Sequence, residues 1–163
     1  MLNKEFRNAF GGFFMGEGMF RISNQKRRGK DELKHPWYRP LVRITLRQDD
    51  EKVLDTICKK IGGHIFRRGI RDKILNKLTG QYTFSRPTTI WQVEDRKTCR
   101  KIAELVLKTP LPSKKKKEAI VMIKFIDFAD KHYQRGKPYP SFVLKRFQEM
   151  EEQIKNLKRF NEK

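Results

Sequence analysis

The stretch Phe10-Gly11-Gly12-Phe13-Phe14-Met15-Gly16-Glu17-Gly18 determines how this sequence is interpreted. Gly12 and Gly16 lie four positions apart, so on a helix they share one face. Their missing side chains allow a second helix to approach closely. Glu17 follows directly, and two such helices in contact would bring two carboxylates together. The stretch therefore predicts a tight pair of helices with an acidic site at one end.

A helix is expected to carry this stretch from the N-terminal side. Asn3 is a favourable N-cap residue, and Glu5 falls in the first turn, where the helix dipole favours negative charge. The glycines around Glu17 are expected to end the helix at about Gly16.

Two segments after the helix alternate apolar and polar residues, which is the pattern of a strand with one face in solvent. The first covers residues 19–28 and the second is centred on residues 42–47. Their polar sides carry Arg and Gln, which suit guanine and adenine edges. The polar side chains are Arg21, Ser23, Gln25 and Arg27 in the first strand and Arg43, Thr45 and Arg47 in the second.

The remaining chain predicts an α+β domain with an antiparallel sheet. One domain is expected over residues 1–163, with a core at about 3–133 and a helical extension at about 140–160. Helices are expected at 49–61, 95–108, 113–132 and 141–160, strands at 64–68 and 88–94, and a basic loop from the end of the first of these strands to about Pro87.

The composition indicates a phosphate-rich partner. There are 39 Lys and Arg against 19 Asp and Glu, giving a net charge of +20 and a pI near 10.2. A surface of this charge attracts nucleic acid, and without an apolar run of about 18 residues no membrane partner is expected. Cys58 and Cys99 suggest ordinary thiols in a reducing compartment. We therefore expect an intracellular protein, in the cytoplasm of a bacterium or phage host, or in an organelle.

The opening stretch resembles the signature motif of the LAGLIDADG homing endonucleases. Phe10 takes the place of the first Leu and Glu17 that of the second Asp, whereas Met15 departs from the pattern, since an Asp is usual there. Three later blocks are similar to conserved segments of the family and follow in the same order, over about residues 5–130. They are residues 39–50 with Ile61-Gly62-Gly63, then Trp91-Gln92-Val93, then residues 110–116.

The resemblance implies a saddle-shaped antiparallel sheet with packed helices, in an αββαββα core. It also implies a site-specific endonuclease that hydrolyses both strands of a long pseudo-palindromic DNA target with a divalent metal. Ligation by oxygen atoms suits Mg²⁺. The alternative within the family is a catalytically inactive DNA-binding protein, or an RNA maturase with RNA as partner. The chain shows no intein splice-junction residues at its ends, so an intron-encoded protein active in intron homing, or a free-standing one, is expected.

The same resemblance assigns catalytic roles. Glu17 is the metal ligand, and Gly16 lends a backbone carbonyl to the metal. Lys115 reaches the water network of the active site, with Lys114 as the alternative. Arg47 or Gln48 would lie near the scissile phosphate.

A single motif supplies one helix and one carboxylate, so we expect a symmetric homodimer. The expected dimer interface is formed by Phe10, Gly12, Phe13 and Gly16. Double-stranded DNA is expected to contact the polar sheet face and nearby basic residues, although such a face can also be merely solvated. The predicted DNA-binding residues are Arg21, Ser23, Gln25, Arg27, Arg28, Lys30, Arg39, Arg43, Thr45, Arg47, Arg67 and Lys114.

Overall fold

Helices and strands follow one another in the order that the periodicity predicts, with one addition. The computed structural model describes residues 3–25, 36–69, 71–75, 80, 82–110, 114–134 and 137–159. The elements are α1 (Lys4–Glu17), β1 (Gly18–Gln25), β2 (Trp37–Arg47), the 3₁₀ turn η1 (Gln48–Asp50), α2 (Glu51–Ile61), β3 (His64–Arg68), β4 (Arg71–Leu75), β5 (Tyr82–Ser85), β6 (Thr88–Val93), α3 (Arg96–Leu107), α4 (Lys114–His132) and α5 (Ser141–Lys158).

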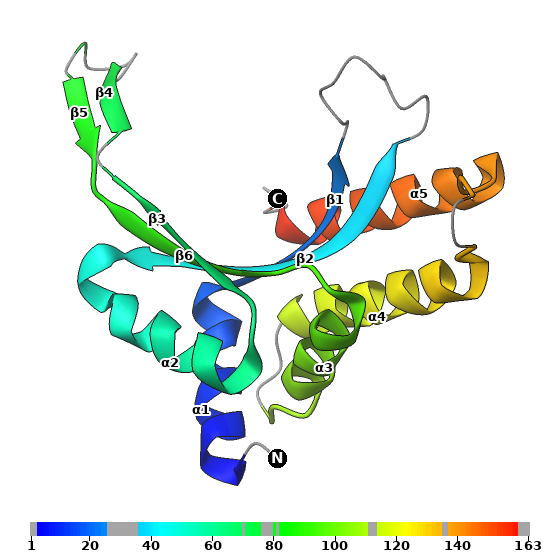
Figure 1. Ribbon diagram of the computed structural model, residues 1–163, viewed down its shortest axis with the longest axis horizontal. Coiled ribbons are helices and arrows are strands. Elements are labelled where there is room, and N and C mark those ends of the chain that lie inside the picture. The colour runs from blue at the N-terminus through cyan, green and yellow to red at the C-terminus, as the bar shows by residue number, and fades with distance from the viewer. Residues whose placement is uncertain are drawn as a thin grey trace.

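The strands form a curved antiparallel sheet in the order β1-β2-β6-β3. Figure 1 shows α1, α2, α3 and α4 on one side of this sheet, while α5 contacts β1 and α4. The other side curves upward into two arms, one formed by β1 and β2 and the other by β3 and β6 (Figure 1). The predicted α+β class and saddle-shaped sheet are confirmed.

Burial follows the alternation of the strands. Phe20, Ile22, Val42, Ile44 and Trp91 have no solvent exposure and face the helices. Their neighbours in sequence therefore face the opposite side of the sheet, because successive side chains of a strand alternate. That side is the open face, which carries Arg21, Ser23, Arg39, Arg43, Thr45, Arg47, His64, Phe66, Arg68 and Gln92.

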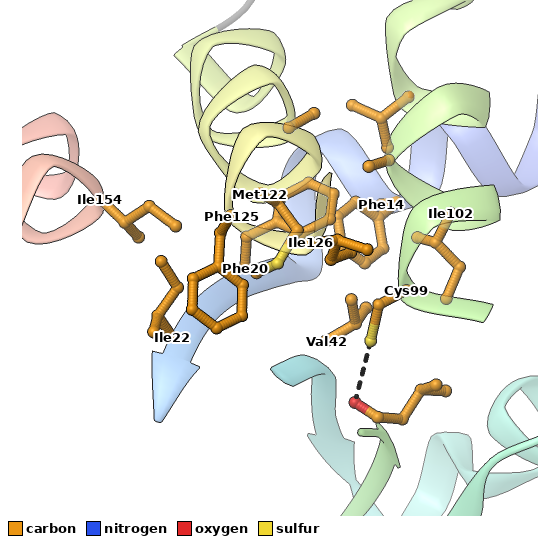
Figure 2. Close-up of a cluster of buried hydrophobic side chains, with 14 of the residues drawn as sticks. Phe14, Phe20, Ile22, Val42, Cys99, Ile102, Met122, Phe125, Ile126 and Ile154 are labelled. Carbon is orange, nitrogen blue, oxygen red and sulfur yellow. Dashed lines mark hydrogen bonds between the residues drawn. The ribbon is translucent and has the colours of Figure 1, made fainter. Parts of the chain in front are cut away.

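One hydrophobic core contains side chains from all five helices and from the sheet. Figure 2 shows Phe14 of α1 and Phe20 of β1 beside Met122 and Phe125 of α4. The buried Cys99 thiol donates a hydrogen bond to the Val93 carbonyl at 3.5 Å (Figure 2). Burial raises the pKa of this thiol well above its usual range, so Cys99 is a core residue rather than a reactive one.

The start of α1 confirms the predicted cap. The Asn3 side chain accepts a hydrogen bond from the Phe6 amide at 2.8 Å. The helix ends at Glu17, one residue later than expected. The first residue of the helix expected at 113–132, Ser113, lies outside the described residues.

The expected basic loop is wrong in part. Residues 71–75 and 82–85 pair as the antiparallel hairpin β4–β5, which prolongs the arm formed by β3 and β6 (Figure 1). None of the helices in the described part of the chain is both long enough and apolar enough to cross a membrane.

Candidate functional site

The end of α1 places an acidic side chain where a helix favours a cation. Glu17 is exposed and is the last residue of α1, and the final turn contains no basic residue. The C-terminal end of a helix carries partial negative charge on its last carbonyl oxygens, which lack intrahelical donors. The Gly16 carbonyl belongs to this last turn. Two hard oxygen donors in a negative field fit a divalent cation such as Mg²⁺.

The glycines of α1, together with Gly18 directly after it, divide into two groups. A Cβ atom on Gly11 would lie 2.6 Å from the Thr109 hydroxyl oxygen, and one on Gly18 would lie 2.4 Å from the Phe14 ring. These two glycines allow α1 to pack closely within its own protomer. A Cβ atom on Gly12 or Gly16 would have no neighbour within 4 Å among the described residues. Gly12 and Gly16 therefore form an open stripe on the outer face of the helix.

An apolar groove borders this open stripe. It encloses about 340 Å³ between α1 and α2 and includes the side chains of Ala9, Phe13 and Val53. Val53 is 43% exposed. A groove of this kind beside an open glycine stripe matches the surface that an approaching helix would bury.

Phe10 requires a correction. It was expected at the dimer interface, but it is only 3% exposed and packs edge-on against Trp91 in its own core. Phe10 lies on the inward face of α1 with Phe14, one helical turn later. Phe10 and Phe13 both line the groove, but Phe13 is the more exposed of the two, being half-buried.

The pairing of β1 with β2 brings Arg47 and Gln48 to the Glu17 end of the sheet. Gly18 pairs with Ile44, so Arg47 lies three residues beyond this pair in the direction of α1. Arg47 is exposed and ends β2, and the Gln48 amide donates to the Pro87 carbonyl at 3.2 Å. Both side chains are exposed at the sheet end where α1 finishes.

The two candidate lysines begin α4. Lys114 is exposed, whereas the Lys115 side chain is only 18% exposed and its ammonium lies 3.8 Å from the Glu118 carboxylate. Burial and an acidic neighbour distinguish Lys115 from a freely solvated lysine.

The predicted DNA-binding residues of β1 and β2 that the structure describes lie on the open face, and their contact with DNA stays a prediction. Arg21, Thr45 and Arg47 are exposed there. The predicted residues that lie outside the described part of the chain are Arg27, Arg28, Lys30 and the side chain of Gln25.

Arg67 requires a second correction. It pairs in register with the buried Thr89, so its side chain points to the helix side of the sheet. There its guanidinium donates to the Glu51 carboxylate of α2 at 2.9 Å. Its neighbours His64 and Arg68 are exposed and pair with Gln92 and Thr88, so they belong to the open face instead.

Two hydrogen-bonding residues that support the arginines of the open face, Gln92 and Glu94, were not predicted from the sequence. Gln92 accepts hydrogen bonds from the Arg43 guanidinium at 2.6 and 3.1 Å and donates to Glu94 at 2.6 Å. Glu94 in turn pairs with Arg39 at 2.9 Å. Alternation between the inward residues Trp91 and Val93 could have placed Gln92 outward. The contacts with Gln92 and Glu94 thus hold Arg43 and Arg39 in place before any ligand binds.

Electrostatic crowding marks the centre of the open face. Burial, and repulsion from Arg68 and Arg21, lower the pKa of Arg43. Three arginines from three strands thus repel one another across one surface. Phosphate groups placed there would relieve that repulsion.

The Glu17 end of α1 offers few metal ligands within one protomer. Among the described residues, no cluster of three or more His, Cys, Asp or Glu side chains could hold a metal ion.

Comparison with known proteins agrees with this geometry. The profile described as LAGLIDADG endonuclease matches residues 10–128, which include the second half of α1, the four-stranded sheet and most of α4. The chain belongs to the LAGLIDADG endonuclease family. This is a family of site-specific DNA-cleaving hydrolases, and the single motif and single domain fit its one-motif type. A search of curated protein sequences gives no significant match.

Solved structures of homing endonucleases share the fold. The endonuclease I-CvuI, bound to a DNA target, has a TM-score of 0.70 at 16% identity, covering 98% of this chain and 86% of that one. I-TnaI has a TM-score of 0.64 at 20% identity, covering 96% and 97%. An archaeal intron-encoded homing endonuclease complexed with DNA has a TM-score of 0.65 at 18% identity, covering 99% and 91%. The similarity extends over nearly the whole chain, including α5.

Proposed function

We propose that two copies of this chain form a homing endonuclease, with their α1 helices in contact and one Glu17 from each copy at a shared cleavage site. The observation that carries this proposal is the open stripe of Gly12 and Gly16, which ends at Glu17. A helix crossing this stripe would also cover the apolar groove at Ala9, Phe13 and Val53. Two identical stripes related by a twofold axis would place the two carboxylates side by side.

The two Glu17 carboxylates and the Gly16 carbonyls would hold divalent metal, which we propose to be Mg²⁺. Bound there, the metal would acidify a water and stabilise the leaving oxygen. The structure of I-CvuI with DNA was determined in the presence of Mg, and a second one in the presence of Ca. Glu17 has the role of ligand, and its position at the negative end of α1 strengthens its attraction for a cation.

Three further side chains would act on the phosphate. Arg47, at the end of β2, would bind the scissile phosphate and offset its negative charge, and Gln48 would orient a water next to it. Lys115 would hold a proton-exchanging water near the same phosphate. Arg47 and Gln48 lie at the end of the sheet where α1 finishes, and α4, which begins next to Lys115, contacts β1, the strand that follows α1.

Sequence recognition is proposed for the open face. Its arginines can donate two hydrogen bonds to a guanine edge, and its polar residues can bind other bases in the major groove. The predicted residues Arg28, Lys30 and Lys114 would add phosphate contacts, and Arg27 would extend the base-reading side of the first strand. A twofold dimer would select a pseudo-palindromic target, and the protein would act where DNA is present, inside a cell or an organelle.

One observation supports the alternative of a DNA-binding protein that does not cut. Met15, at the position where the family motif usually has an acidic residue, is half-buried and packs against the core. In that case the Glu17 carboxylate would be present, but the protein would bind DNA without cleaving it.

The test begins with selection of a bound target from a randomised duplex pool in Ca²⁺. Wild-type protein is expected to cleave that duplex in Mg²⁺, and Glu17→Gln is expected to lose about 10³-fold in rate while binding with unchanged affinity. Glu5→Gln, at the other end of α1 and also exposed, is the matched control and should cleave at the wild-type rate. Tight binding without cleavage in any divalent ion would establish the binding protein instead.

A further inference from the structure

Glu118 is a buried carboxylate to which the proposed reaction assigns no role. It lies one turn after Lys115 in α4 and is only 1% exposed. Neither of its carboxylate oxygens has a hydrogen-bond partner among the described residues. Burying an acid without hydrogen bonds is unfavourable, so its place in the core calls for an explanation beyond packing.

Two lysines approach this carboxylate from different helices. The Lys115 ammonium lies 3.8 Å from one oxygen. Lys158, near the end of α5, is coupled electrostatically to Glu118, and its own ammonium donates a hydrogen bond to the Phe20 carbonyl. Burial raises the pKa of Glu118, while Lys115, Lys158, the Phe20 amide and Lys114 oppose that rise. Glu118 is therefore the acidic centre of a group of cations.

Glu118 and Lys158 also lie against the backbone of β1, the strand that follows Glu17. Phe20 lies in β1, three residues after Glu17, and β1 is an edge strand of the sheet. The Phe20 amide lies close enough to Glu118 to lower its pKa, although the geometry falls short of a hydrogen bond. The start of α4 and the end of α5 therefore meet the backbone of β1 at one residue.

We propose that Glu118 is a positioning residue that holds the Lys115 ammonium at a fixed place relative to Glu17. The inference rests on the proposed function, in which Lys115 and Glu17 act on the same phosphate. A lysine side chain loses rotamer freedom when it is fixed. An ion-pair partner inside the core fixes it before the substrate arrives, so less of that loss falls on the reaction itself.

Cleavage kinetics separate positioning from a purely structural role. Glu118→Gln keeps the shape of the side chain and removes its charge. It should lower the single-turnover cleavage rate about 10- to 100-fold, with the dissociation constant for DNA in Ca²⁺ changed by less than about twofold. The matched control is Glu149→Gln, because Glu149 pairs with Arg146 at the same three-residue helical spacing but is exposed. This control should cleave at the wild-type rate.

A second measurement does not depend on cleavage. The ¹⁵N order parameter of the Lys115 ammonium, identified by the signal that Lys115→Met removes, should be high in wild type and fall clearly in Glu118→Gln. An unchanged order parameter overturns the positioning role, whatever the kinetics. Equal losses of rate and DNA affinity in Glu118→Gln also overturn it, since they indicate damage to the fold. Wild-type protein that cuts no target refutes the proposed function alone, and the order parameter still decides the role of Glu118.

Discussion

Glu17 occupies a position that helix electrostatics disfavour. Negative side chains stabilise the first turn of a helix and destabilise the last, and α1 has Glu5 in the first turn and Glu17 at the end. Glu5 thus follows the rule and Glu17 breaks it. A residue that breaks a local rule at an exposed position is expected where function requires it. A cation bound at Glu17 would turn the unfavourable electrostatic interaction at this end of α1 into a favourable one.

At the same scale, the titration of Glu118 predicts how stability changes with pH. Burial raises the pKa of Glu118 despite the opposing cations Lys114, Lys115 and Lys158. The folded protein therefore binds this proton more tightly than the unfolded chain does, and the contribution of Glu118 to the free energy of unfolding falls as pH rises through the unfolded and then the folded pKa.

Glu118→Gln lacks this titration. The melting temperature of the variant minus that of wild type should become more positive between about pH 4 and pH 7, because the unfolded glutamate has a pKa near 4.3. Calorimetry across this range measures the difference. A difference that stays constant, or that becomes more negative with rising pH, contradicts the raised pKa.

Among the helices, α1 presents two opposite faces that a pair of matched variants can distinguish. Gly11→Ala places a methyl group 2.6 Å from the Thr109 hydroxyl oxygen, which itself donates to the Leu105 carbonyl. It should lower the free energy of unfolding of the protomer by about 1–3 kcal/mol. Gly12→Ala meets open space in the protomer and should raise this free energy by about 0.5–1 kcal/mol. Urea unfolding below the dimer dissociation constant measures both.

In self-association the order of the two variants should be reversed. Gly12→Ala, which is the more stable protomer, should form the weaker dimer. Gly12→Ala should weaken the dimer about tenfold or more, since the added methyl group separates the two crossing helices. Sedimentation equilibrium gives the dissociation constant. If Gly12→Ala associates as tightly as wild type, the open stripe is not the dimer interface.

Strand β3 offers a second matched pair, Arg67 and Arg68. Arg68 lies on the open face, whereas Arg67 pairs with Glu51 on the helix side. Arg68→Ala should weaken DNA binding and reduce the slope of log affinity against log salt by about two, one for each subunit of a dimer. Arg67→Ala should leave the slope unchanged. Filter binding over a salt series tests both, and equal slopes for the two variants would exclude the assignment of faces.

How far the sequence determines these elements depends on how sharply each pattern alternates. In β1 and β2 apolar and polar residues alternate over residues 20–23 and 42–47, so the open face could be predicted. In β3 the two consecutive apolar residues Ile65 and Phe66 leave the register ambiguous, and Arg67 was assigned to the wrong side. Residues 71–75 contain no alternation, which explains why β4 was predicted as loop.

The residues of the site could be predicted only where a short stretch of sequence is enough to identify them. Glu17 follows from the glycine motif, but Phe10 and Phe13 are both aromatic, and only packing shows that Phe10 faces its own core. Glu118 looked like one charge in a lysine-rich segment. Its burial depends on α5 and β1, which are distant in sequence, so no local pattern could reveal it.

Over the whole molecule, the two faces of the sheet have separate tasks. The helix side contains the core that fixes α1, α4 and α5 around the start of β1. The open side contains the arginines of three strands, partly held by Gln92 and Glu94. In a dimer, the open faces of the two subunits would therefore recognise the two half-sites of a DNA target, on either side of a central cleavage site.

This arrangement predicts how the enzyme responds to changes in its target. A twofold dimer reads both half-sites with identical residues, so perfect palindromes built from either half of the selected target should be cleaved at rates within about tenfold of the original. One base pair inserted at the centre moves the half-sites apart by about 3.4 Å and rotates them by about 34°. The two open faces could then not bind both half-sites with the Glu17 pair at the scissile phosphates. Cleavage should fall at least about 100-fold, whereas binding of a single half-site by one subunit should persist. Rates on the four duplexes measure this, and an inserted duplex that is cut as fast as the original would show that the subunits act independently, each with a complete site of its own.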